Sequence, residues 1–274
     1  MGQGGHHLSA RAGRWPALCR GLIASIGMAS LALTLAAGPA AATSCWGETG
    51  KPLAAVFTGL SPEGDVRLPG DARGRLIGVR ILPADAASAD LGALLKAWEG
   101  QALHSAGQPG PDRWSRLPLV VGDAGRGDDL GLALVQRGFA MAWPAELPPN
   151  CRIRYLQAEQ QARRAKRGRW AMAELGLQDA ADGARVALKA GEMIVMQGKV
   201  MHVGQTRTTT YLNFGARQVG ASAEFGMPVW RALERQGWTT QTLRGQNIRV
   251  RGVASIGRPA RVLVDDVSSI EFAE

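Results

Sequence analysis

The sequence contains little cysteine, histidine or aromatic residue. Its 274 residues include 3 cysteines and 4 histidines, and aromatic residues make up 5%. His104 and His202 stand alone, without partners at the spacing of zinc ligands. The sequence also lacks the Gly-x-Ser-x-Gly, Gly-Lys-Ser/Thr and glycine-rich dinucleotide motifs. These absences argue against a zinc enzyme, a serine hydrolase with a nucleophile elbow, a P-loop nucleotidase and a dinucleotide-dependent enzyme.

Lysine is scarce too, although the chain is basic. Lysine and arginine together number 32 against 23 acidic residues, a net charge of +9, and most of the basic residues are arginine. A preference for arginine is commonly a consequence of codon usage, but guanidinium groups also make planar two-point contacts with phosphate. With 46% hydrophobic and 20% charged residues, the chain is expected to fold, as one large domain or two small ones.

The first 42 residues have the composition of a secretory signal. Residues 11–20 carry three arginines and no acid, residues 21–37 are apolar, and small residues follow up to Ala42. We therefore expect cleavage near Ala42 and a periplasmic or secreted protein. Polar residues interrupt the apolar stretch and no later stretch is long enough to span a bilayer, so no permanent membrane span is expected after cleavage. A lipoprotein anchored at Cys45 is the alternative.

Cleavage of the signal would leave two cysteines. Cys19 is lost with the signal, whereas Cys45 and Cys151 remain. Because an oxidising compartment permits disulfides, we expect these two to pair. Closing a loop of this length contributes about 3 to 5 kcal/mol to stability in the loop-entropy model. The alternative is two unpaired thiols.

The chain after the signal divides into two parts by its hydrophobic patterns. The first part, 43–175, has strand-like runs and then helical periodicity. Its expected elements are strands over 56–68, 74–82 and 117–121 and helices over 86–98, 128–138 and 152–167. Residues 176–190 are small and polar without periodicity, which predicts a linker. The second part, 191–274, alternates like a small β-barrel. Its expected elements are strands over 192–203, 208–214, 247–253, 259–264 and 268–272 and a helix over 230–236.

Four motifs of the first part resemble the thermonuclease (staphylococcal nuclease-like) family. They are Arg75-Leu76-Ile77-Gly78-Val79 with Pro83, Asp112-Arg113-Trp114-Ser115-Arg116, Leu134-Val135-Gln136-Arg137-Gly138-Phe139-Ala140, and Leu156, Ala158, Glu159, Ala162, Arg163, Gly168 and Trp170. The resemblance covers roughly residues 53–172. It implies a five-stranded OB barrel with three helices, and the second part looks like the extra OB-like domain of some exported bacterial members. The expected fold class is therefore α+β, mainly β, with two OB-like barrels.

The resemblance implies phosphodiester cleavage by two arginines, a glutamate base and a calcium ion held by aspartates. Arg75 and Arg116 match the two arginines, which would offset charge on a pentacoordinate phosphorus. The carboxylates match less well, because Ala84 stands where the base is expected and Asp85, one residue on, is the best substitute. Asp65 is the candidate metal ligand. Arg80 stands at the other ligand position, where its positive charge disfavours calcium.

Nucleic acid is the partner that this resemblance implies, either DNA or RNA. In the first part, Arg80 and Arg113 are the further candidate contacts. In the second part, Tyr211, Arg249 and Arg251 could combine base stacking with phosphate contacts. Alternating aromatic residues and arginines are also common where a strand has one face in a core and one in solvent.

Two functions remain open at this point. One is an exported phosphodiester hydrolase with a degenerate calcium and base site. The other is a noncatalytic envelope protein that binds nucleic acid, another polyanion or a protein partner. Both phosphate hypotheses require Arg75 and Arg116 to point into one concave pocket. Asp85 within reach of that pocket favours the hydrolase, whereas a pocket filled by Arg80 favours the binding protein.

Overall fold

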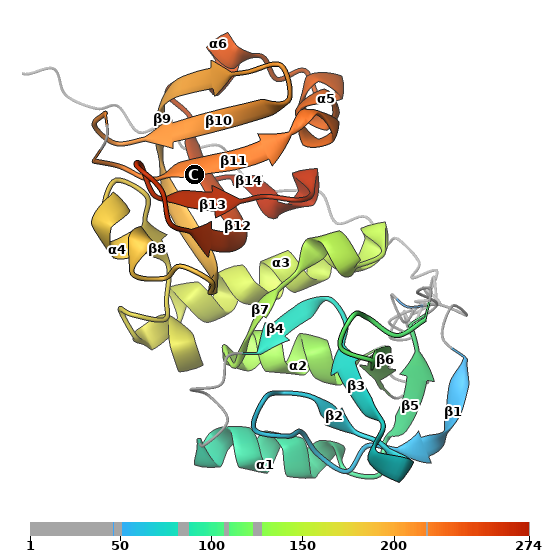
Figure 1. Ribbon diagram of the computed structural model, residues 1–274. Coiled ribbons are helices and arrows are strands. Elements are labelled where there is room, and N and C mark those ends of the chain that lie inside the picture. The colour runs from blue at the N-terminus through green and yellow to red at the C-terminus, as the bar shows by residue number, and fades with distance from the viewer. Residues whose placement is uncertain are drawn as a thin grey trace, which may run out of the picture. The chain divides into compact units, whose positions relative to one another are not determined.

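The computed structural model describes residues 46, 51–81, 88–106, 110–122, 128–217 and 219–273 (Figure 1). The expected signal over 1–42, Cys45 and Asp85 lie outside these residues. Within them, none of the helices combines the length and the apolar character needed to cross a membrane. The predicted α+β class with OB-like barrels is confirmed. The first part of the chain forms a five-stranded sheet, the second forms a seven-stranded sheet that contains a closed ring, and both parts also contain helices.

The first barrel is built from five short strands. Its strands are β1 (Pro52–Val56), β2 (Val66–Arg67), β3 (Arg73–Leu76), β5 (Ala102–Ser105) and β6 (Arg116–Val121), in the order β1-β5-β6-β3-β2. All neighbours are antiparallel except β3 and β6, which run parallel. An isolated antiparallel bridge pairs Val66 of β2 with Leu60, which follows β1 in the chain. Outside the barrel, β4 (Val79–Ile81) pairs with β7 (Ala140–Ala142).

Three α-helices accompany the first barrel, at the places where the sequence predicts them. They are α1 (Ala89–Trp98), α2 (Leu130–Arg137) and α3 (Pro149–Arg164). The Asp129 carboxylate caps α2 by accepting a hydrogen bond from the backbone N–H of Leu132 at 2.8 Å. Gly138 ends α2 at φ 76°, and a Cβ there would lie 2.2 Å from the carbonyl oxygen of Arg167. Only glycine therefore fits this helix end.

The second barrel is a closed ring of five strands. Its members are β9 (Met193–Gln205), β10 (Thr209–Phe214), β11 (Ser222–Gly226), β13 (Arg261–Leu263) and β12 (Asn247–Ser255), and β12 pairs back with β9. Strand β14 (Ile270–Phe272) extends the sheet beyond β12. Helices α5 (Met227–Arg235) and α6 (Thr240–Leu243) lie between β11 and β12 in the chain. Strand β11 has no counterpart among the expected elements.

The segment expected to be a linker carries secondary structure. Residues 176–190 include β8 (Gln178–Asp179), which runs parallel to β9, and the short helix α4 (Gly183–Ala187). Ala180 and Val186 are fully buried in the hydrophobic core of the second barrel. The segment contains too few apolar residues to show a helical or strand-like hydrophobic period. Its structure depends instead on the burial of these few side chains in the barrel core and on the pairing of β8 with β9.

A buried charge network joins α3 to the second barrel. Arg251 of β12 is fully buried, and its Nη1 donates to a Glu159 carboxylate oxygen and to the carbonyl oxygen of Ala142, both at 2.9 Å. Its Nη2 donates to Glu159 and to Glu271. Burial alone would lower the pKa of Arg251, but the two carboxylates raise it above its ordinary value and keep the side chain charged. Arg251 therefore has no surface for a nucleic acid, and this expected contact is wrong.

Replacing Arg251 should destabilise the protein strongly. The variant Arg251→Met leaves Glu159 buried without its main partner, which costs about 3 to 5 kcal/mol of unfolding free energy. Denaturant unfolding measures this loss. The matched control is Arg261→Met, because Arg261 is 40% exposed in its pair with Glu224 and should cost under about 1 kcal/mol. Equal losses in both variants would contradict a structural role for the buried network.

Candidate functional site

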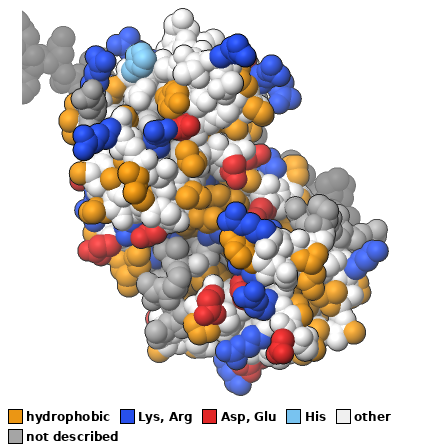
Figure 2. Space-filling model, viewed as in Figure 1, with side chains coloured by type: hydrophobic (Ala, Val, Ile, Leu, Met, Phe, Trp, Pro, Cys, Tyr) orange, Lys and Arg blue, Asp and Glu red, His pale blue; other side chains and the backbone are white. Residues whose placement is uncertain are grey.

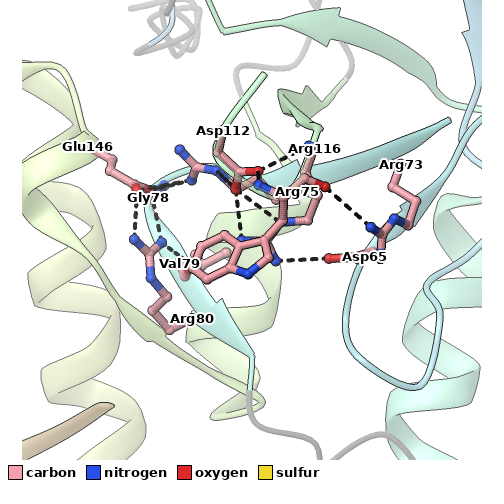
Figure 3. A network of polar contacts seen from close by, with 10 residues as sticks. Asp65, Arg73, Arg75, Gly78, Val79, Arg80, Asp112, Arg116 and Glu146 are labelled. Atoms are coloured by element: carbon pink, nitrogen blue, oxygen red, sulfur yellow. Dashed lines mark hydrogen bonds and ion pairs between the residues drawn. The ribbon is translucent and has the colours of Figure 1, made fainter. Parts of the chain in front are cut away.

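Arginines and carboxylates of the first barrel meet in one pocket. The cavity has a volume of about 330 Å³ and lies where β3, β4, β6 and the turn Pro144–Glu146 come together (Figure 3). Its lining residues are Glu63, Gly64, Asp65, Arg75, Leu76, Val79, Arg80, Ile81, Asp112, Trp114, Arg116, Glu146 and Met193. Arg75 and Arg116, expected from the sequence to converge, therefore line the same pocket.

Local backbone geometry positions the two arginines. The parallel register of β3 and β6 places Arg73 opposite Arg116 and Arg75 opposite Pro118. Before β6, the Asp112 carboxylate accepts hydrogen bonds from the backbone N–H groups of Trp114 and Arg116, both at 3.0 Å. These bonds form an Asx-type turn, which explains why an aspartate begins the segment 112–116.

Glu146 holds two of the arginines and was not expected from the sequence. Its carboxylate accepts from Arg75 Nη1 at 2.9 and 3.0 Å and from Arg80 at 2.9 and 2.6 Å (Figure 3). It also accepts from the backbone N–H of Gly78 at 3.1 Å. Burial alone would raise the pKa of Glu146, but Arg80 and then Arg75 lower it below its ordinary value. Glu146 is therefore an ionised carboxylate in the place where an incoming anion would meet these arginines.

Arg116 is held by two other carboxylates. Its Nε and Nη2 donate to Asp112 at 3.0 and 2.8 Å, and its Nη1 donates to Asp65 at 3.1 Å. Burial opposes ionisation of Asp112, but Arg116 lowers its pKa below the ordinary value. Arg73 lies 3.6 Å from the second oxygen of Asp65. Every arginine that lines the pocket is thus paired with a carboxylate of the same pocket.

These side chains do not fit a calcium ion. Asp65, the candidate metal ligand, faces the positive charges of Arg73 and Arg116. Arg80 also directs its guanidinium group into the pocket, to Glu146. Among the described residues, no group of three histidine, cysteine, aspartate or glutamate side chains is placed to hold a metal. A calcium ion would have to compete with guanidinium groups for the same carboxylate oxygens.

Trp114 forms an exposed aromatic platform at the pocket. Its side chain is 51% exposed, unlike the buried Trp143. The guanidinium carbon of Arg113 lies 3.8 Å from the Trp114 ring centroid, and that of Arg116 lies 4.8 Å away. Arg113, an expected nucleic-acid contact, thus lies against Trp114 but is not among the residues that line the pocket. The Trp114 ring thus makes cation–π contacts with both guanidinium groups, and about half of the residue's surface stays exposed.

The remaining expected site residues lie elsewhere. Tyr211 is half-buried on β10 of the second barrel. Arg249 donates to the Gln197 side chain at 2.7 Å and pairs with Glu271 at 3.4 Å, so it is engaged within the protein. Cys151 is fully buried and takes part in a disulfide, and its pairing with Cys45 stays a prediction. Asp85, the expected base, lies outside the described residues.

Basic residues do not form a continuous band on the visible surface. On the face that Figure 2 shows, lysine and arginine side chains occur in several separate groups among hydrophobic and acidic side chains. The arrangement favours local contacts with an anionic ligand over a long electrostatic track on this face.

Comparisons with known proteins identify no family. No protein-family model and no curated protein matches the chain. One solved structure to which the chain is similar is titled "OBody AM1L10 bound to hen egg-white lysozyme", with a TM-score of 0.27 and 13% sequence identity. The match covers 34% of this chain and 91% of that chain. A likeness at this score supports no conclusion about function.

Acid should weaken the contribution of Glu146 to stability. Because its pKa is lowered in the folded protein, this contribution is complete above the ordinary glutamate value of about 4.3 and is lost as pH falls through the lowered pKa. Glu146→Gln should therefore cost about 1 to 3 kcal/mol of unfolding free energy at pH 7. The difference from the unmodified protein should shrink below about pH 4. Denaturant titrations at several pH values measure it.

The control for this experiment is Glu99→Gln. Glu99 pairs with Lys96 at the surface, where such pairs contribute little. This variant should change stability by under about 1 kcal/mol at neutral pH. A Glu146→Gln difference that stays constant from pH 7 to pH 3 would show that the Glu146 charge does not stabilise the arginines.

Proposed function

We propose that the protein binds single-stranded nucleic acid through the arginine pocket and does not cleave it. The observation that carries this proposal is Trp114, half-exposed and flanked by Arg113 and Arg116 at the edge of that pocket. Stacking of a base on an aromatic side chain contributes about 1 to 3 kcal/mol and tolerates any base. Single strands present bases in this way, whereas the bases of a duplex are stacked on one another.

Phosphate recognition in this proposal occurs by exchange of partners. Arg75 and Arg116 are held by carboxylates, so a phosphate group must take the place of Glu146 or Asp112 beside them. The guanidinium plane offers two parallel N–H donors to either kind of anion. Since the carboxylates are already present, much of the charge attraction is offset, and binding is expected to be moderate and to weaken with salt.

The same pairing argues against hydrolysis. A general base must be free to accept a proton from water, and its pKa should lie near the working pH. Asp112 and Glu146 instead have lowered pKa values and accept hydrogen bonds from arginines. Both carboxylates are therefore poor bases, and they act as internal ligands of the arginines.

Phosphodiester hydrolysis remains the second candidate function, on one observation. Arg75 and Arg116 lie in one pocket, as a clamp for a pentacoordinate phosphorus requires. The base in that mechanism would be Asp85, which lies outside the described residues. The two candidates agree on the ligand and differ in whether the strand is cut.

Replacing Trp114 should weaken binding of a single-stranded oligonucleotide. Trp114→Ala is expected to cost about 1 to 3 kcal/mol of binding free energy, measured by fluorescence anisotropy with labelled DNA and RNA. Arg75→Ala should weaken binding uniformly across sequences and reduce the salt slope by about one unit. The matched control is Arg231→Ala, on an exposed position of α5, which should change neither quantity.

Glu146→Gln should have the opposite effect. Removing the charge that competes with phosphate beside Arg75 and Arg80 is expected to tighten binding by up to about tenfold, equivalent to 1.4 kcal/mol. A variant that binds as weakly as Arg75→Ala would contradict the exchange of partners. Incubation of the same oligonucleotides with calcium or with chelator should leave them intact. Cutting that is lost in both Arg75→Ala and Arg116→Ala would instead establish the hydrolase.

A further inference from the structure

A second cavity lies beside α3, apart from the arginine pocket. It has a volume of about 320 Å³ and is lined by Gln160, Arg163, Arg164, Trp170, Leu177 and Arg249. These residues come from α3, from the short turn Gly168–Ala171 that follows it, from the segment before β8, and from β12. The lining contains three arginines and no carboxylate, and it shares no residue with the pocket around Arg75.

Three of the lining side chains carry buried N–H groups without a hydrogen-bond acceptor among the described residues. They are Nη2 of Arg163, Nε of Arg249 and Nε1 of Trp170. Arg163 has a side-chain exposure of 9% and Trp170 an exposure of 8%, so water solvates neither side chain freely. Buried donors without partners are uncommon in folded proteins, and each one costs stability. Three such donors on one cavity point to an acceptor that the part of the chain described by the structure does not supply.

The charges around this cavity are also out of balance. Among the described residues, Arg163, Arg249 and Arg251 pair with two carboxylates, those of Glu159 and Glu271. Burial lowers the pKa of Arg163, and the charges of Arg249 and Arg251 oppose its ionisation further, against the effect of Glu159. A bound anion would relieve this repulsion.

We propose that this cavity, the α3–β12 anion site, binds a tetrahedral oxyanion of the phosphate class. Such an anion presents several acceptor oxygens at once and can accept from two guanidinium groups and an indole N–H together. The shared chemistry is a phosphate group, supplied either as free phosphate or by the backbone of a nucleic acid. The site does not depend on the function proposed for the arginine pocket.

The test is a calorimetric titration of the full-length protein with sodium phosphate, against sodium chloride at equal ionic strength. Saturable binding of phosphate is the expected result. Trp170→Phe keeps the ring but removes the indole donor, and Arg249→Gln removes one guanidinium group while keeping a polar side chain. Each variant should weaken phosphate binding by about tenfold or more, as expected for the loss of a charge-assisted or buried hydrogen bond.

The control is Arg261→Gln, a surface arginine paired with Glu224, which should bind phosphate as the unmodified protein does. Thermal unfolding of each variant verifies that it is folded. The proposal is overturned if the unmodified protein shows no saturable binding, or if folded Trp170→Phe and Arg249→Gln proteins both retain it. Loss of binding in Arg75→Gln alone would likewise overturn it, because the phosphate would then lie in the other pocket.

A second titration distinguishes the two sources of the phosphate group. Single-stranded oligonucleotide is titrated into Arg249→Gln and into Arg261→Gln. If the group belongs to a nucleic acid, Arg249→Gln should weaken oligonucleotide binding about tenfold as well. If the ligand is free phosphate, oligonucleotide binding should be the same in both variants while phosphate binding differs.

Discussion

The pairing of arginines with carboxylates away from bulk water is the interaction on which this structure depends. A guanidinium group does not lose its charge, so burying one requires an anion at hydrogen-bond distance. In the pocket, Glu146 meets this requirement for Arg75 and Arg80, and Asp112 and Asp65 meet it for Arg116. In a second group, Glu159 and Glu271 surround Arg251. The first group shapes the pocket of the first barrel, and the second connects α3 with a strand of the second barrel.

The same constraint determines what the pocket can do. Arginines that are held by internal carboxylates are already oriented, which reduces the entropy lost when a ligand binds. Their charges are also partly neutralised. The binding free energy of an anion is therefore only the difference between its own interactions with the arginines and the interactions of the carboxylate that it replaces, Glu146 or Asp112. A pocket of this kind suits reversible recognition better than catalysis, since the carboxylates that could act as bases are stabilised as ions.

Local signals in the sequence predicted much of the fold but only part of the site. Helix α2 follows from the apolar spacing and Gly138, and the arginines of the pocket follow from their motifs. Glu146 could not be predicted, because it lies 71 residues from Arg75 in a proline-rich turn whose position depends on the finished fold. Arg251 alternates with buried residues of β12 like a solvent-facing side chain, yet α3 covers it. Only the tertiary contacts of the folded protein show that Glu146 enters the pocket and that Arg251 is buried.

The most direct test of the account is a crystal structure of the protein with a short single-stranded oligonucleotide. The account predicts an intact strand with one base stacked on the Trp114 indole. It also predicts a phosphate within hydrogen-bond distance of Arg75 or Arg116, and a carboxylate displaced from that arginine. A strand bound on another surface, with the Arg75–Glu146 and Arg116–Asp112 pairs unchanged, would contradict it.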